Sequence, residues 1–179
     1  GGARAEAQFV GLGTLVTDVL QQVTTRVTTW YQYDPLAQTF TVDEAMQIAG
    51  VDLFFTEKDG PVTVQLRETS NGFPTRTILG TGRVEPEDIV VTGGGHTRIL
   101  FDSPVAVVAG TEYAVAVLSD TPGNAVAIAE LSEFDPILQQ HVAQQPYQIG
   151  VLLSSSNAST WTAHQSKDLA FRLLRAHYE

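Results

Sequence analysis

Apolar and polar residues alternate in short runs along most of this chain, and the alternation predicts β-strands. Residues 62–67 show it most clearly, because Val62, Val64 and Leu66 are each followed by a polar residue. Successive side chains of an extended strand point to opposite faces of the sheet. This run therefore predicts a strand with one buried face and one wet face.

Similar strand-like runs cover much of the chain between residue 37 and the C-terminus. They lie at residues 37–42, 46–55, 77–84, 89–91, 97–101, 105–108, 113–118, 125–129, 145–153 and 169–177. Turn residues such as Asn-Gly, Asp-Pro and Gly-Gly separate most of these runs. No amphipathic helix of about ten residues intervenes to connect parallel strands, so the pattern predicts an all-β, antiparallel sandwich or barrel.

Two segments carry more specific expectations. A strict period of two in residues 46–55 places Ala49 on the same face as Val51 and Leu53. Residues 162–165 have the Thr-x-x-Gln spacing of a capping box, in which the two side chains satisfy free backbone N–H groups. A single helical turn is expected there.

The N-terminal segment differs from the rest of the chain. Residues 1–18 show no sustained period, and β-branched residues become dense in residues 19–33, which predicts an extended strand or linker. A helix over residues 15–23 is the alternative. Pro35 cannot donate a ladder hydrogen bond and restricts Asp34, so we expect a corner here. The predicted organisation is an arm or linker, residues 1–32, followed by a β-sandwich domain, residues 33–179.

Length, charge and cysteine content narrow the functional classes. The 179 residues are 43% hydrophobic, enough for one substantial core, and the net charge is −10. The electrostatic field of a negatively charged protein repels the phosphate backbone of nucleic acids, so we expect no nucleic-acid partner. The absence of cysteine excludes disulfides, thiolate nucleophiles and Cys-ligated zinc. No apolar run reaches the ~18–20 residues of a membrane helix, so no membrane insertion is expected.

The sequence offers no positive support for a metal, a cofactor or catalysis. The four histidines, His96, His141, His164 and His177, lie in different segments, and none belongs to a two-His motif. The glycine clusters lack the residues of a dinucleotide or phosphate loop. No serine lies in a Gly-x-Ser-x-Gly elbow. We therefore expect no metal, no cofactor and no enzymatic activity.

Pairs of acidic residues are the nearest approach to a catalytic signal. They are Asp43-Glu44, Glu87-Asp88 and Glu133 with Asp135. A glycoside hydrolase needs two carboxylates roughly 5–10 Å apart. Each pair lies in a predicted loop, where solvated acids are the ordinary explanation.

One polar loop is a candidate for ligand or partner contact. Trp161 could offer an apolar face, and amide and hydroxyl groups nearby could bind a sugar or a partner surface through Asn157, Ser159, Thr160 and Gln165. The alternative is structural: Trp161 packs the loop onto the sandwich, and the small polar side chains close backbone hydrogen bonds.

Two aromatic residues near the end of the predicted arm are candidates for an assembly contact. Trp30 and Tyr31 could anchor the arm on a neighbouring subunit. They could equally cover one edge of their own sandwich.

Several short segments of the sequence resemble, in the same order, segments of a domain found in tailed-bacteriophage virion proteins. Those proteins are tail, baseplate and fibre-associated components. The segments are residues 33–40 (YDPLAQTF), 51–55 (VDLFF), 71–74 (NGFP), 111–114 (TEYA), 145–147 (QPY), 157–162 (NASTWT) and 168–172 (DLAFR). The resemblance runs from about residue 33 to the C-terminus and leaves residues 1–32 outside it. This chain has Ala163 where the family usually has proline after Trp-Thr.

The resemblance implies a jelly-roll-like β-sandwich and a structural, non-enzymatic role in the virion tail, with assembly in the host cytoplasm. The implied partners are other virion structural proteins and further copies of this chain, with the arm docking on neighbours. A carbohydrate- or receptor-binding module that contacts a host-surface glycan is the alternative. A glycan-cleaving enzyme is a third possibility with less support.

Overall fold

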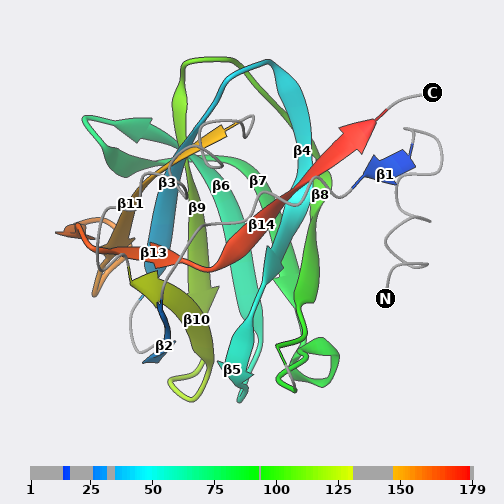
Figure 1. Ribbon diagram of the computed structural model, residues 1–179, viewed down its shortest axis with the longest axis vertical. Helices are drawn as coiled ribbons and strands as arrows, with labels where there is room; N and C mark the ends of the chain where they lie inside the picture. The colour runs from blue at the N-terminus through cyan, green and yellow to red at the C-terminus, as the bar shows by residue number, and fades with distance from the viewer. Residues whose placement is uncertain (1–13, 17–25, 32–34, 93, 131–146, 178–179) are drawn as a thin grey trace.

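The computed structural model describes residues 14–16, 26–31, 35–92, 94–130 and 147–177, and these form β-strands joined by turns and loops (Figure 1). The strands within these residues are β1 (Thr14–Val16), β2 (Arg26–Tyr31), β3 (Leu36–Val42), β4 (Met46–Leu53), β5 (Phe55–Glu57), β6 (Val62–Ser70), β7 (Phe73–Val84), β8 (Thr97–Val107), β9 (Glu112–Ser119), β10 (Ala125–Glu130), β11 (Tyr147–Ser154), β12 (Thr162–His164), β13 (Lys167–Leu169) and β14 (Phe171–His177). A short 3₁₀ turn, η1 (Pro86–Asp88), follows β7. No helix in this part of the chain is long and apolar enough to cross a membrane.

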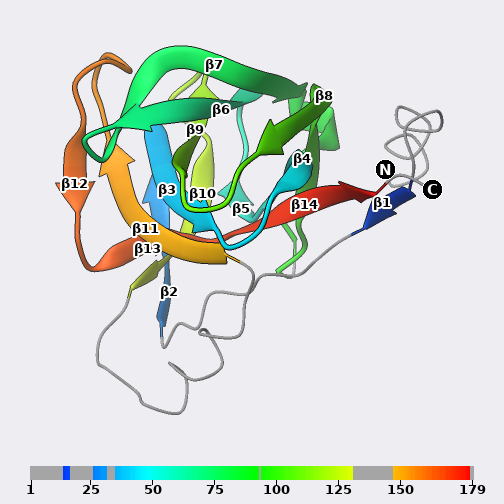
Figure 2. The same ribbon diagram turned by 90° about the horizontal axis from the view of Figure 1, so that it is seen from above.

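Within the described residues, hydrogen bonds join the strands into three antiparallel sheets. The two larger sheets have the strand orders β1-β14-β4-β8 and β12-β11-β3-β9-β6-β7. The third sheet has the order β13-β10-β2, and β5 also pairs with β10. In Figures 1 and 2, β14, β4 and β8 lie side by side toward the right, and β11, β3 and β9 lie toward the left. The predicted all-β antiparallel sandwich is confirmed, while the finer jelly-roll assignment stays an expectation.

Most predicted runs coincide with strands. The runs on either side of residues 102–104 form one strand, β8, whose pairing with β4 shifts register near this point. The Asn71-Gly72 turn between β6 and β7 has positive φ at both residues, as a tight two-residue hairpin requires. Residues 89–91 are not in a strand, although Ile89 is buried in the core.

The N-terminal strands β1 and β2 lie at sheet edges. Among the described residues, β1 pairs with β14 alone, and β2 pairs with β10 alone. Both strands belong to the predicted arm, and backbone hydrogen bonds hold them on the sandwich of their own chain. The predicted domain boundary at residue 33 stays a prediction, because residues 32–34 lie outside the described part.

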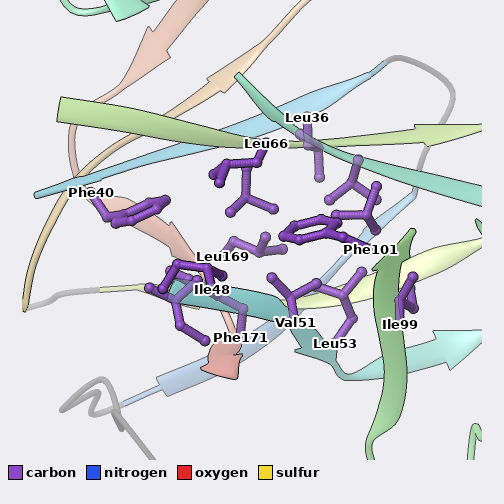
Figure 3. Close-up of a cluster of buried hydrophobic side chains, with 14 of the residues drawn as sticks. Leu36, Phe40, Ile48, Val51, Leu53, Leu66, Ile99, Phe101, Leu169 and Phe171 are labelled. Atoms are coloured by element: carbon purple, nitrogen blue, oxygen red, sulfur yellow. The ribbon is translucent and has the colours of Figure 1, made fainter. Parts of the chain in front are cut away.

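The hydrophobic core lies between the sheets (Figure 3). Its largest fully buried side chains include Phe40 of β3, Leu66 of β6, Phe101 of β8 and Leu169 of β13. Burial of one such side chain contributes about 1.5–3 kcal/mol relative to its exposure. All three sheets contribute to this single cluster, so the core joins them into one body.

A β-bulge in β4 corrects the predicted faces of that strand. The pairing with β8 shifts register between Ile48 and Gly50. Ala49 therefore leaves the core face, which Val51 and Leu53 share, and packs in a small cluster on the outer face. An extra residue in one strand interrupts a strict period of two.

The predicted helical turn at residues 162–165 is wrong. Residues Thr162–His164 form β12, which pairs with β11. This pairing gives the backbone the hydrogen bonds that a helix start would need from capping side chains. Thr162 and Gln165, the two capping-box residues, are exposed.

The two larger sheets meet where β7 passes β8. Each is the last strand of its sheet. A Cβ atom at Gly82 of β7 would overlap the carbonyl oxygen of Leu100 in β8, so only glycine permits this close approach. Sheet contact at this corner closes one side of the sandwich.

A buried polar pair joins β3 to β13. The Nε2 of Gln38 donates to Oδ1 of Asp168 at 3.2 Å, and its Oε1 accepts the backbone N–H of Leu169 at 2.9 Å. Asp168 is 7% exposed. Burial raises the pKa of Asp168 to about 6, and the hydrogen bond from Gln38 opposes this rise only in part.

We expect Asp168→Asn to stabilise the protein at neutral pH. The folded-state pKa of about 6 exceeds the ordinary value of 3.8. The unfolded state therefore holds fewer protons between these pH values, and the stability contributed by this group falls as the pH rises through that window. Asparagine keeps an acceptor for Gln38 and carries no charge, so it should remove this fall.

Chemical denaturation of the parent and the Asp168→Asn variant at several pH values would test this expectation. Above about pH 6 the variant should gain on the order of 2–3 kcal/mol, and the gain should vanish near about pH 4. A gain that is the same at every pH would contradict the assignment to Asp168.

Candidate functional site

The loop between β11 and β12 folds over the outer face of the six-stranded sheet (Figure 2). Trp161 anchors it: the residue is 8% exposed and packs with Ala37, Ala116 and Leu153, which come from three neighbouring strands. A ring buried in this way presents little of its face to a sugar. The geometry therefore favours the packing interpretation of Trp161.

Asn157 closes this loop on itself. Its Oδ1 accepts the backbone N–H groups of Ser159 at 2.9 Å and Thr160 at 2.8 Å, and the hydroxyl of Ser155 at 3.0 Å. The amide oxygen is thus used within the loop. The side chains of Ser159, Thr160 and Gln165 are exposed, and their role as ligand or partner contacts stays a prediction.

Arg67 fastens the loop to β6 and β7, and sequence reasoning missed this role. Its Nη1 donates to the carbonyl oxygens of Ala158 at 3.3 Å and Thr75 at 3.4 Å. Its Nε and Nη2 both donate to Oε1 of Gln65, at 2.9 and 2.6 Å. Arg67 lies on the face predicted to be wet, yet it is 6% exposed because the loop covers it.

The buried guanidinium of Arg67 has only neutral acceptors among the described residues. Burial lowers its pKa from the ordinary value. Carbonyl oxygens from two separate segments converge on one largely buried side chain, so the arrangement suits a clamp. The clamp and Trp161 together hold the loop in a fixed position.

Trp30 and Tyr31, the predicted assembly contacts, lie in β2. Their backbones pair in register with Val126 and Ala125 of β10. Their side chains are outside the described part of the structure, so the assembly contact stays a prediction.

A serine and a histidine meet beside the loop. The hydroxyl of Ser154 and Nε2 of His164 are 2.8 Å apart on the adjacent strands β11 and β12. Burial and the nearby Lys167 lower the pKa of His164. Acyl transfer needs, besides such a pair, donors aimed at a developing oxyanion. The contact is a cross-strand hydrogen bond, and no sequence motif indicated it.

Two of the three predicted acid pairs lie on the surface. Asp43 and Glu44 are exposed between β3 and β4, and Oε1 of Glu44 pairs with Nη1 of Arg175 at 3.1 Å. Glu87 and Asp88 are exposed in η1. The third pair, Glu133 and Asp135, lies outside the described residues.

Two other carboxylates line an open hollow near β5. Glu57 and Asp59 share it with Lys58, whose Nζ donates to the carbonyl of Ile89 at 3.1 Å. Both carboxylates are exposed, whereas the general acid of a glycoside hydrolase is shielded from water. In the described part of the chain, no three acidic or histidine side chains gather to hold a metal ion.

Comparison with known proteins adds little to these observations. No family model matches the chain, and no curated protein matches it. Among solved structures, the chain is similar to an aminopeptidase from the marine sediment archaeon Thaumarchaeota archaeon, with 12% sequence identity and a TM-score of 0.30. The match covers 90% of this chain but 27% of that aminopeptidase. A likeness this weak carries no argument about activity.

We expect Trp161→Ala to destabilise the sandwich by about 3 kcal/mol, because truncation of a buried aromatic ring leaves a cavity. Ser159→Ala, an exposed change in the same loop, should alter stability by less than about 0.5 kcal/mol. Urea denaturation would measure both effects, and a glycan array would be run on the parent and both variants. Binding of a glycan that is lost in a stably folded Trp161→Ala protein would contradict the packing role.

Proposed function

We propose that this chain is a non-enzymatic structural component of a phage virion that holds neighbouring subunits together in a tail, baseplate or fibre. The virion assignment comes from the resemblance that begins at residue 33. The structural observation that supports the joining role is the attachment of β1 and β2, which the sandwich holds through sheet edges.

Edge pairing suits a joining role because the same contacts can form between chains. The register of β1 on β14 runs from Thr14↔His177 to Val16↔Arg175. Backbone hydrogen bonds of this kind are indifferent to which copy supplies the added strand. Exchange of an N-terminal strand between copies is a low-cost route to oligomers. The partners in this proposal are further copies of the chain and other virion structural proteins.

Buried polar side chains also support the role of a rigid body. Asn124 is fully buried and holds the turn after β5: its Oδ1 accepts the N–H of Asp59 at 2.7 Å, and its Nδ2 donates to the carbonyl of Gly60 at 3.0 Å. Gln38 and Arg67 bind backbone groups in the same way. A protein that keeps partners in fixed geometry needs turns and loops held like these.

The second candidate function is a carbohydrate- or receptor-binding module that contacts a host surface. The observation in its favour is the fixed loop between β11 and β12, which exposes Ser159 and Thr160. Preorganised hydroxyls lower the entropy lost when a ligand binds. The buried ring of Trp161 counts against it.

Deletion of residues 1–32 should abolish assembly while the remaining sandwich stays folded. The deletion removes β1 and β2, and it leaves the strands that build the core, β3 onward, in place. Circular dichroism would report folding, and sedimentation velocity would report assembly beside the full chain.

A deletion of residues 1–13, which keeps both N-terminal strands, is the matched control and should assemble like the full chain. The joining role of the arm would be wrong if the chain without residues 1–32 assembled as the full chain does.

A further inference from the structure

The outer face of the four-stranded sheet carries three charged side chains in one row. Asp52 lies on β4 and pairs in register with Arg98 of β8 on one side and with Arg172 of β14 on the other. Residues directly opposite each other on neighbouring antiparallel strands have Cβ atoms about 4.5–5.5 Å apart. The pairing therefore brings two guanidinium groups to one carboxylate.

The carboxylate of Asp52 is fully buried and lies among three basic side chains. Arg98 binds both of its oxygens, with Nε 3.0 Å from Oδ1 and Nη2 3.3 Å from Oδ2. Nη1 of Arg172 and Nε2 of His96 each lie 4.0 Å from Oδ2. The two-point contact with Arg98 is the geometry of a strong, charge-assisted pair.

Arg172 is held in place but keeps its hydrogen-bond donors. Its guanidinium carbon lies 5.0 Å from the centre of the Phe54 ring, and the same ring meets His96 edge-on at 6.5 Å. Stacking on an aromatic ring fixes the plane of the guanidinium fork. Within the described residues Arg172 donates no hydrogen bond, and its side chain is 25% exposed.

The cluster has an excess of positive charge in an acidic protein. Two arginines face one buried carboxylate, whereas the whole chain has a net charge of −10. These side chains reach solvent, with 23% of the Arg98 and 42% of the His96 side chain exposed. A guanidinium fork with spare donors fits a second carboxylate, which it can bind at two points.

We propose that Arg98, Arg172 and His96 form a binding site for a side-chain carboxylate of a second copy of this chain. The inference rests on the proposed function, since it names one contact through which copies would join. Charge complementarity favours this occupant: the chain has 20 acidic residues, and its exposed carboxylates include Asp43 and the pair Glu87-Asp88.

The sign of the charge also limits the geometry of the contact. A two-fold axis through this site would bring two positive clusters together, so the site must meet a different, acidic surface of the neighbouring copy. Such a contact is one half of a two-fold interface, in which each copy's site meets the other's acidic surface, or a head-to-tail contact that closes into a ring or continues as an open chain.

Sedimentation velocity over a concentration series, in about 150 mM salt, would test the site with the full chain. Salt at this level screens the long-range repulsion between acidic copies and leaves short contacts. Arg172→Ala should weaken self-association at least tenfold. Arg172→Lys should show an intermediate loss, because lysine keeps the charge and loses the fork.

Arg76→Ala is the matched control, because Arg76 is an exposed arginine on β7 and its loss changes the net charge equally. It should leave association unchanged. Arg172 is chosen over Arg98 because removal of Arg98 would leave Asp52 buried without its two-point partner. Thermal melting of each variant would verify folding.

Three results would overturn the proposed site. They are a parent that stays monomeric throughout the series, an Arg172→Ala variant that associates like the parent, and an equal loss in Arg172→Ala and Arg76→Ala. If deletion of residues 1–32 abolished association while Arg172→Ala did not, the site would be wrong and the joining role of the arm would stand.

Discussion

Burial of apolar side chains between the sheets is the interaction on which this structure depends. The chain has no cysteine, so packing around residues such as Phe40, Leu66 and Phe101 holds the layers together. Such a core uses one face of each strand that lines it. The outer faces, the sheet edges and the loops are therefore the parts available for contact with other molecules.

The outer faces of the two larger sheets each hold a buried charged side chain, and the partners of that side chain differ between the two faces. On the six-stranded sheet, the guanidinium of Arg67 binds carbonyl and amide oxygens and is covered by a loop. On the four-stranded sheet, the buried carboxylate of Asp52 lies beside Arg98 and Arg172, whose side chains reach water. The first arrangement stabilises a loop, since the acceptors that Arg67 binds among the described residues are neutral. The second leaves a positive surface on an acidic protein, and so it is the better place for a charged partner.

The alternation of apolar and polar residues predicted most of the strands correctly. It predicted the wrong face for a side chain where pairing with a neighbouring strand changes the register. Val62, Val64 and Leu66 face the core as their alternation predicts. Ala49 does not, because a bulge against β8 shifts its register. The loop around Trp161 allowed a ligand and a packing interpretation, and only the buried position of the ring distinguishes them. The alternation of apolar and polar residues predicts which side chains face the core. It does not predict which polar side chains, such as Arg67, are covered by a loop.

The sequence by itself determined the class of this fold, because a period of two and turn residues at short intervals are properties of neighbouring residues. Only the tertiary structure decided which strands lie side by side. Asp52 stands between Arg98 and Arg172 because β4 lies between β8 and β14 in one register. Pairing between strands distant in the chain depends on the whole core, since a shift of one residue would turn every buried side chain outward.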